Sequence, residues 1–155
     1  MSILFMQVGG TLDKGYPPGN DNHGYAFKIG QPAYLTILKR AGVSFRWRHY
    51  ELLQKDSLDM TQQDRHMLAS TVYAWPEKKV IVTHGTDTIL ASARTLAGYS
   101  NHKTIVLTGA MLPEKFRDSD ADFNLGMATA AVQYLPPGVY IALRGKVVPW
   151  DKFKE

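Results

Sequence analysis

Two threonines, Thr11 and Thr86, each stand shortly after an apolar run of the chain. Thr11 follows a pair of glycines, and Thr86 lies within the segment HGTDT at 84–88. If both apolar runs are buried parallel strands, both hydroxyls lie at the carboxyl edge of one sheet, where open α/β sheets bind their ligands. A threonine hydroxyl becomes a useful nucleophile when a base takes its proton and donors stabilise the oxyanion that forms. These residues therefore favour acyl transfer to a threonine.

Side chains that could assist the threonines lie close to them in the sequence. Tyr16 and Tyr25 fall in the loop after Thr11, and either could act as a base if a lysine lowered its pKa. Asp87 directly follows Thr86, so these two residues and a lysine from elsewhere could form a hydroxyl–carboxylate–ammonium set. As a fixed carboxylate, Asp87 could instead hold an ammonium group of a substrate. Both roles stay open.

Further polar residues follow two other apolar runs. Asp56 and Ser57 come after the second run, and the segment TGA at 108–110 ends the fourth. Each group has a structural explanation of its own, since Thr86 could cap a helix and Ser57 could begin a turn. Four such groups along one edge of a parallel sheet favour a common pocket.

The chain alternates strand and helix patterns. Continuous apolar runs predict buried strands, and apolar residues spaced three and four apart predict helices. Strands are predicted at 3–8, 43–53, 79–83, 103–107 and 139–143, and helices at 31–41, 61–73, 86–96 and 118–132. Residues 12–27, rich in proline and glycine, predict a long lid or binding loop. The order of elements predicts one domain over residues 1–155, a three-layer α/β/α fold with a doubly wound, mostly parallel sheet.

Composition excludes several kinds of site. The 155 residues include no cysteine, which rules out disulfides, thiol catalysis and cysteine-bound metals. The five histidines lack metal-binding spacing, and there is no Walker A loop, dinucleotide fingerprint or G-x-S-x-G elbow. The formal charge of +4 is spread over scattered basic pairs, which is typical of a solvated surface and does not indicate a nucleic-acid partner. With no signal peptide or membrane segment, we expect a cytoplasmic protein without a metal or cofactor.

Several segments resemble the signature blocks of the bacterial-type L-asparaginases. They are GGTLDK at 9–14, HGTDT at 84–88, TGAMLP at 108–113, SDA at 119–121 and FNL at 123–125. The blocks occur in the family's order and cover nearly the whole chain, and the combination of GGT with HGTDT is specific. The resemblance is to the amino-terminal domain only. It implies a short, single-domain member, because the usual second, smaller α/β domain is missing from this chain.

The resemblance implies hydrolysis of L-asparagine to L-aspartate and ammonia, with weak glutaminase activity, by a homo-oligomer that needs no cofactor. Thr11 matches the nucleophilic threonine of the family and Thr86 the second catalytic threonine, although which of them acts first stays open. Asp87 matches the acid that binds the α-amino group of the substrate. Lys154 is the best match to the catalytic lysine, with Lys152 a close rival.

The resemblance also implies a set of substrate-binding positions. Ser57 matches the serine that holds the α-carboxylate of the substrate. Ala110 stands where the family uses a backbone carbonyl to orient the side-chain amide. The substrate-binding residues implied in this way are Gly10, Asp56, Ser57, Gly85, Thr86, Asp87 and Ala110.

Three departures from the family pattern bear on the site. Leu58 replaces the glutamine that follows the serine in two-domain members, so one substrate contact is missing. The loop tyrosine matches Tyr16 by its distance from Thr11, whereas register with residues 29–30 places Phe27 there; we favour Tyr16 because only it is ionisable. Without a second domain, the site is open, completed by a partner protomer, or less selective. The competing hypothesis is a non-catalytic amino-acid-binding or sensor module that keeps the pocket.

Overall fold

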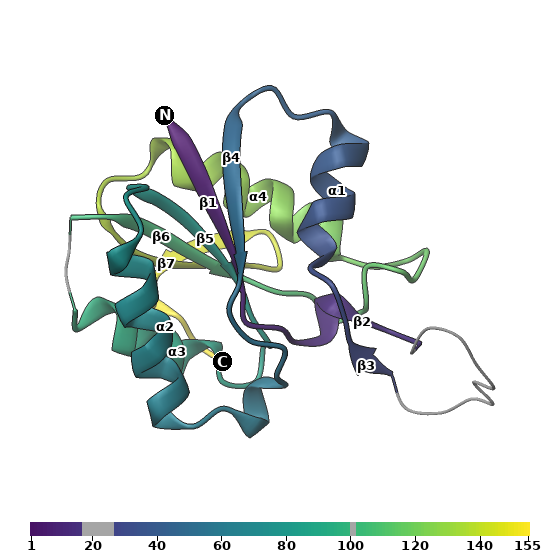
Figure 1. The fold of residues 1–155 in the computed structure, drawn as a ribbon, viewed down its shortest axis with the longest axis horizontal. Helices are drawn as coiled ribbons and strands as arrows, with labels where there is room; N and C mark the ends of the chain where they lie inside the picture. Colours follow the sequence, from purple (N-terminus) through teal and green to yellow (C-terminus); the bar gives the residue numbers. More distant parts are fainter. Residues whose placement is uncertain (17–26, 100–101) are drawn as a thin grey trace.

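The computed structural model describes residues 1–16, 27–99 and 102–155. Within them, a six-stranded sheet forms the centre of the fold, in the strand order β4-β1-β5-β6-β7-β8 (Figure 1). Its strands are β1 (Ser2–Gln7), β4 (Arg46–Glu51), β5 (Lys79–Thr83), β6 (Thr104–Thr108), β7 (Gly138–Leu143) and β8 (Lys146–Pro149). The first five strands in this order are parallel, and β8 joins β7 in the antiparallel sense. The prediction of a mostly parallel sheet is confirmed.

Strand β1 shows why the inner strands appear as continuous apolar runs. Ile3 and Phe5 belong to one hydrophobic core, while Leu4 and Met6 belong to the other. Successive side chains of a strand face opposite sides of a sheet, so a strand covered on both sides needs apolar residues at every position. The apolar runs of the sequence therefore predict strands that are buried on both faces.

In the described part of the chain, four helices cover the two faces of this sheet (Figure 1). They are α1 (Ala33–Ala41), α2 (Gln62–Ala74), α3 (Ile89–Ala97) and α4 (Ala121–Tyr134). Apolar residues of α1 and α4 belong to the core on one face, and those of α2 and α3 belong to the core on the other. This arrangement confirms the predicted three-layer, doubly wound α/β/α fold.

Helices α1, α3 and α4 begin two or three residues later than the sequence predicts. Pro32 explains the start of α1, because the residue before a proline disfavours the helical conformation. In front of α3, Thr88 has a non-helical backbone (φ −124°, ψ 24°), and its N–H donates to the hydroxyl of Ser57 over 3.2 Å. The prediction that Thr86 opens this helix is wrong, because Thr86 and Asp87 lie in the turn that precedes it.

Helix α2 begins as predicted, at a capping box. The hydroxyl of Thr61 accepts the backbone N–H of Asp64 over 3.1 Å, and the carboxylate of Asp64 accepts the N–H of Thr61 over 2.9 Å. The carboxylate also pairs with Lys55 at 2.8 Å, and this hydrogen-bonded pair lowers the pKa of Asp64. The helix ends at Ala74, just before Pro76.

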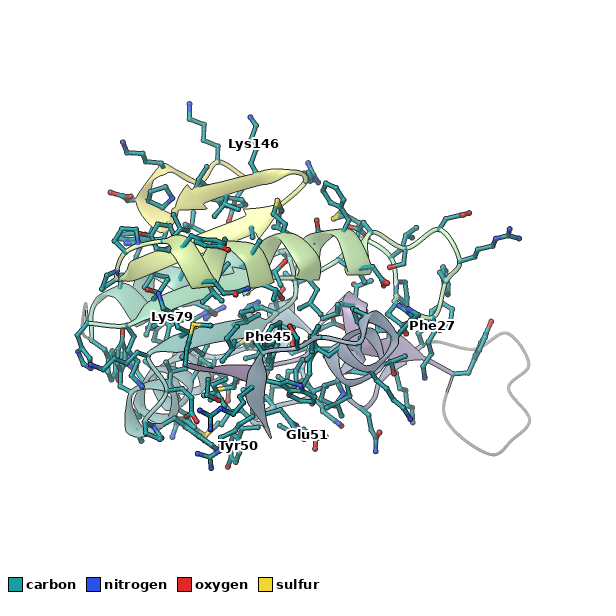
Figure 2. The ribbon with its side chains drawn as sticks, turned by 90° about the horizontal axis from the view of Figure 1, so that it is seen from above. Phe27, Phe45, Tyr50, Glu51, Lys79 and Lys146 are labelled. Atoms are coloured by element: carbon teal, nitrogen blue, oxygen red, sulfur yellow. The ribbon has the colours of Figure 1, made fainter. Side chains whose placement is uncertain are left out.

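Strand β4 forms one edge of the sheet and shows the predicted alternation. Phe45, which precedes the strand, and Trp47 pack against the core that contains α1, whereas the residue between them is exposed. Tyr50 and Glu51 point away from the body of the molecule, as does Lys146 on the opposite edge strand (Figure 2). Charged side chains on edge strands discourage pairing with other chains.

Strand β8 makes the sheet one strand wider than the five strands expected from the sequence. It follows β7 through a two-residue turn in which Arg144 (φ 54°) and Gly145 (φ 80°) both have left-handed backbones. Positive φ at both central residues is the type I′ geometry that suits a β-hairpin. The four residues of β8 are too few for a recognisable apolar run.

Two short strands frame the segment predicted as a long loop. β2 (Lys14–Gly15) pairs antiparallel with β3 (Lys28–Ile29). Residues 17–26 lie outside the described residues, and most of the loop prediction falls on them. The described ends of this segment therefore form a small hairpin beside the main sheet (Figure 1).

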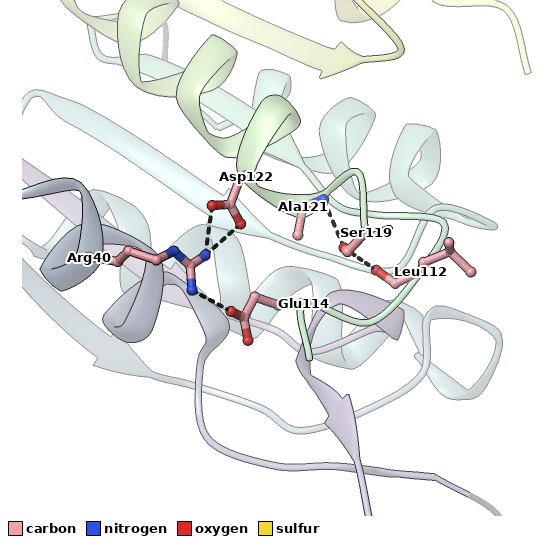
Figure 3. A network of polar contacts seen from close by, with 6 residues as sticks. All are labelled: Arg40, Leu112, Glu114, Ser119, Ala121 and Asp122. Atoms are coloured by element: carbon pink, nitrogen blue, oxygen red, sulfur yellow. Dashed lines mark hydrogen bonds and ion pairs between the residues drawn. The ribbon is translucent and has the colours of Figure 1, made fainter. Parts of the chain in front are cut away.

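Charged groups tie α1 to α4 and to the loop between β6 and α4. Arg40 of α1 donates to both carboxylate oxygens of Asp122, at 2.8 and 2.6 Å, and to Glu114 at 3.1 Å (Figure 3). Asp122 lies on α4, and Glu114 lies in the loop before it. Within this loop, the hydroxyl of Ser119 donates to the carbonyl of Leu112 over 2.8 Å (Figure 3). The loop between β6 and α4 is thus fixed by its contact with α1 and by a hydrogen bond within the loop.

Candidate active site

The loops after four neighbouring strands meet at the carboxyl edge of the sheet. In sheet order the strands are β4, β1, β5 and β6, and the segments after them carry Ser57, Thr11, Thr86 and Ala110. Because these strands are parallel, all four loops leave from the same edge. The topology therefore brings the predicted site residues of these loops to one side of the domain.

Two glycines let these loops touch. A Cβ added to Gly10 would lie 2.5 Å from the Cα of Gly85, and one added to Gly85 would lie 2.8 Å from the hydroxyl oxygen of Ser57. Side-chain carbons do not come so close to other atoms, so the contact needs glycine at both positions. Thr11 and Thr86 directly follow these two glycines. Since consecutive Cα atoms are about 3.8 Å apart, the Cα atoms of the two threonines lie within about 12 Å of each other.

The loop after β6 packs against the same turn. A Cβ on Gly109 would overlap the carbonyl oxygen of His84 and would lie 3.4 Å from Cγ2 of Thr86. The side-chain amide of Asn124 on α4 donates to the carbonyl of Gly109 over 2.9 Å and fixes this peptide. Ala110 is buried beside it, and no described residue donates to its carbonyl oxygen. Among the described residues, the Ala110 carbonyl therefore has no hydrogen-bond donor.

The predicted catalytic groups have few protein partners. Within the described residues, the hydroxyl of Thr11 makes no hydrogen bond, and Oγ1 of Thr86 approaches only the sulfur of Met111, at 3.8 Å. Asp87 is exposed and forms no ion pair with those residues. By contrast, the hydroxyl of Thr108 donates to a carbonyl of β7 over 2.7 Å. Polar groups inside a fold normally find partners, so half-buried hydroxyls without them are available to a ligand.

A cavity of about 750 Å³ opens beside the Thr86 turn. It is lined by Thr86, Asp87, Met111, Asp120, Leu143, Arg144, Lys146, Val148, Lys152, Phe153, Lys154 and Glu155. Both candidate lysines, Lys152 and Lys154, thus share a cavity with Thr86 and Asp87. Arg144 and Lys146 add positive charge from the β7–β8 hairpin, which the sequence did not reveal as part of the site because β8 is so short.

Other predicted site residues do not line this cavity. They are Gly10, Thr11, Tyr16, Asp56, Ser57, Gly85 and Ala110. Asp56 pairs with Lys14 at 3.1 Å. Ser57 is buried, and its hydroxyl accepts the N–H of Thr88. Ser57 also begins the 3-10 turn Ser57–Asp59, as its structural explanation predicted, while its own O–H proton stays available to a second acceptor.

The two candidates for the loop tyrosine position lie against each other. The ring centroids of Tyr16 and Phe27 are 4.8 Å apart, and Phe27 is 5.3 Å from the ring of Phe116. Tyr16 is 53% exposed. Tyr25 lies outside the described residues. The structure thus places Tyr16 in an aromatic cluster at the end of β2.

Asp13, in the segment GGTLDK, has a role that sequence reasoning missed. It is buried, and its carboxylate accepts hydrogen bonds from the side-chain amide of Gln7 at 2.9 Å and from the N–H of Ala33 at 2.7 Å. Burial raises the pKa of Asp13 to about 7, while both hydrogen bonds act in the opposite direction. These bonds anchor the Thr11 turn to β1 and to the start of α1. The sequence signal was the place of Asp13 between Leu12 and Lys14, in a block that follows an apolar run.

His84 is the second buried titratable group beside the site. Burial lowers its pKa to about 4, so its imidazole is neutral near pH 7. One ring nitrogen lies 2.7 Å from the carbonyl oxygen of Gly85, and the other lies 2.7 Å from the hydroxyl of Ser92. His84 therefore contacts the backbone that leads into Thr86.

Within residues 1–16, 27–99 and 102–155, no three His, Asp or Glu side chains gather closely enough to hold a metal ion. None of the helices in this described part of the chain has the length and apolar character that crossing a bilayer requires.

The fold is an α/β domain, and its candidate site lies at the carboxyl edge of the sheet, where such folds bind their ligands. Residues 2–151 match the family described as "Asparaginase, N-terminal". The chain therefore belongs to the asparaginase family, as the resemblance of its sequence blocks indicated.

Characterised relatives agree with this assignment. The chain is 28% identical to the L-asparaginase of Thermococcus kodakarensis over 155 residues, which are 96% of this chain and 45% of that protein. The structure of the thermostable L-asparaginase from Thermococcus kodakarensis matches it with a TM-score of 0.83 at 25% identity, over 97% of this chain and 46% of the other. The probable cytoplasmic L-asparaginase from Campylobacter jejuni matches with a TM-score of 0.73 at 26% identity, over 96% and 48%. The chain spans about half the length of these relatives.

Proposed function

We propose that this chain carries the catalytic groups of an amidohydrolase that cleaves the side-chain amide of L-asparagine to L-aspartate and ammonia. The family assignment supports this activity. The observation that carries the proposal is the contact between Gly10 and Gly85, because it places the two loops that bear Thr11 and Thr86 side by side. Among the described residues, the hydroxyl of Thr11 has no hydrogen-bond partner and that of Thr86 faces only the sulfur of Met111.

The reaction starts with attack of one threonine hydroxyl on the amide carbon of asparagine. The tetrahedral oxyanion collapses with loss of ammonia and leaves an acyl-enzyme, which water then hydrolyses. Thr11 is the proposed nucleophile, and Tyr16, five residues further along the chain, is the candidate base. Thr86 supplies the second catalytic hydroxyl. Lys154 lines the same cavity and is proposed to accept the proton of that hydroxyl. None of these steps requires a metal or a cofactor.

The substrate is held by groups on both sides of the scissile amide. Asp87 pairs with the α-ammonium group, for which its unpaired, exposed carboxylate is suited. Ser57 donates its free O–H to the α-carboxylate. The unpaired carbonyl of Ala110 accepts an N–H of the side-chain amide and orients it. Gly10, Gly85 and Asp56 complete the binding surface through the backbone and through the ion pair of Asp56 with Lys14.

Ammonia release by the purified protein tests this function. We expect turnover of L-asparagine at millimolar concentrations and slower turnover of L-glutamine, whose extra methylene moves the amide away from the threonines. D-asparagine serves as the control, because its ammonium and carboxylate groups cannot both reach their partners. Folded protein that releases no ammonia from L-asparagine contradicts the proposal, and calorimetric binding of aspartate without turnover would identify an amino-acid-binding module instead.

Self-association is part of the proposal, since the resemblance implies a homo-oligomer. Light scattering of the purified protein measures the number of protomers directly. We expect the mass of an oligomer, which is a multiple greater than one of the 17.3 kDa of a single chain. A strictly monomeric protein that is active would show that one protomer completes its own site.

A further inference from the structure

Arg65 is a buried guanidinium on α2 that meets no carboxylate among the described residues. It is 8% exposed. Its Nε donates to the hydroxyl of Ser92 over 3.2 Å, and its Nη2 donates to the hydroxyl of Thr88 over 3.0 Å. A buried charge paired only with neutral groups costs stability, so packing alone is a poor reason for an arginine here. The two hydroxyls that it contacts both lead to the Thr86 turn.

The first branch runs through Ser92 and His84, and its hydrogen bonds can have only one direction. The carbonyl of Gly85 can only accept, so Nδ1 of His84 carries the ring proton and donates to it over 2.7 Å. In the neutral ring Nε2 is then an acceptor, and the hydroxyl of Ser92, 2.7 Å away, donates its proton to it. Arginine can only donate, so the same hydroxyl accepts from Nε of Arg65. The low pKa of His84 agrees with this neutral tautomer.

The second branch runs through Thr88 to Ser57. The hydroxyl of Thr88 accepts from Arg65 and donates to the carbonyl of Ser57 over 2.8 Å. The backbone N–H of Thr88 donates in return to the hydroxyl of Ser57. Both ends of the turn from Gly85 to Thr88 are therefore connected to the same guanidinium. Between them, and among the described residues, the Thr86 hydroxyl faces only the sulfur of Met111 and Asp87 forms no ion pair.

We propose that Arg65, Ser92 and His84 are positioning residues that fix the Gly85–Thr88 turn and thereby aim the Thr86 hydroxyl and the Asp87 carboxylate at the substrate. The catalytic part of this inference rests on the proposed function. The physical part does not, because it concerns only the backbone of the turn. Fixing the carbonyl of Gly85 sets the plane of the Gly85–Thr86 peptide, and a rotation of that plane displaces the Thr86 side chain. Displacements of about 1 Å at reacting groups cost on the order of a hundredfold in rate.

The test compares Ser92→Ala with Thr95→Ala, a matched variant that removes a hydroxyl from the same helix outside the network. Thr95 donates to the carbonyl of Ala91 over 3.2 Å and has no contact with His84. We expect Ser92→Ala to lower kcat for L-asparagine at least tenfold with little change in KM, and Thr95→Ala to keep kcat within twofold. Ser92→Thr, which restores a hydroxyl, should recover most of the lost kcat. An unchanged kcat in folded Ser92→Ala protein overturns the inference.

A second readout keeps the inference separate from the proposed function. Amide hydrogen exchange at Gly85–Thr88 should speed up at least tenfold in Ser92→Ala relative to Thr95→Ala, and the imidazole ¹⁵N signals of His84 should lose the Nδ1–H pattern. If the wild type releases no ammonia while these changes occur, the proposed function fails and the positioning of the turn stands. Unchanged exchange and an unchanged tautomer overturn the positioning role itself. If Ser92→Ala does not fold, Thr88→Val removes the other branch at a half-buried position, and kcat together with amide exchange at Gly85–Thr88 measures its effect.

Discussion

At the scale of single residues, the hydroxyls of this domain divide into those that hold the fold and those that do not. Thr108 and Thr88 donate to backbone carbonyls over 2.7 and 2.8 Å. The hydroxyl of Thr11 makes no hydrogen bond within the described residues, and the hydroxyl of Thr86 faces only a sulfur atom there. The fold therefore does not need the hydroxyls of Thr11 and Thr86, which is the expected property of groups reserved for a substrate.

Replacing these hydroxyls should separate activity from stability. We expect Thr86→Val and Thr11→Val each to reduce ammonia release from L-asparagine below detection, because each removes a proposed catalytic oxygen at nearly constant shape. The free energy of unfolding should change by no more than about 0.5 kcal/mol, as at positions without structural hydrogen bonds. Ammonia assays and urea unfolding measure the two quantities.

Thr108→Val is the matched control for this pair. It has the same change of shape, but it leaves the buried carbonyl of Ala142 without its donor. We expect a loss of about 1 to 3 kcal/mol of stability. If Thr86→Val is as destabilising as Thr108→Val, the hydroxyl of Thr86 stabilises the fold and is not reserved for a substrate.

The raised pKa of Asp13 makes a prediction about pH. The folded protein binds a proton at Asp13 up to about pH 7, whereas the unfolded chain releases it near pH 3.8, so this group makes stability fall as pH rises between these values. The neighbouring Tyr34 stays neutral over this range, because burial and the charges of Asp13 and Glu51 raise its pKa. His84 has a lowered pKa and acts in the opposite direction between about pH 4 and 6.5.

Comparison of Asp13→Asn with the wild type isolates this effect, because the contribution of His84 is common to both proteins. We compare the free energy of unfolding of the variant minus that of the wild type. This difference should increase by up to about 4 kcal/mol from pH 4 to pH 7, because only the wild type loses the stabilising proton at Asp13. Urea unfolding at a series of pH values measures it. A constant difference between the two proteins would show that Asp13 ionises as an ordinary surface carboxyl.

At the scale of elements, the sequence predicted best where burial dictates residue type. The inner strands are apolar at every position because helices cover both faces, and their positions followed from the apolar runs. The cap of α2 followed from Thr61 and Asp64. The start of α3 did not, because it is set by a hydrogen bond from Thr88 to Ser57, a residue more than thirty positions away in the chain. Such tertiary contacts leave no local pattern.

The capping box of α2 gives a prediction at this scale. Thr61→Ala removes the acceptor for the N–H of Asp64 and should lower the free energy of unfolding by about 1 kcal/mol. Thr61→Ser keeps the acceptor and should stay close to the wild type. Urea unfolding of the two variants measures the difference; equal loss in both would mean that the methyl group of Thr61, and not its hydroxyl, stabilises the helix start.

At the scale of the whole molecule, the candidate site follows from the order of the strands. The loops that carry Ser57, Thr11, Thr86 and Ala110 leave β4, β1, β5 and β6, which are consecutive in the sheet although β4 follows β1 in the chain. The sequence could predict that all four loops share one edge, because parallel strands place their carboxyl ends together. It could not predict which loops touch, since this depends on strand order and on the close approach of Gly10 and Gly85.

The sequence did not indicate every residue that lines the cavity. Lys152 and Lys154 were predicted by resemblance, and both line the same cavity as Thr86. Arg144 and Lys146 were missed because the hairpin that presents them depends on a short edge strand. The site thus combines groups visible in sequence blocks with groups contributed by the hairpin at the far edge.

A crystal structure with L-aspartate bound tests the central claim most directly, namely that Thr11 and Thr86 serve one site. We expect the side-chain carboxylate of aspartate to lie within hydrogen-bond distance of both threonine hydroxyls, and its ammonium group to contact Asp87. Aspartate bound elsewhere, or in contact with only one of the two hydroxyls while the other faces away, would contradict a shared site of Thr11 and Thr86.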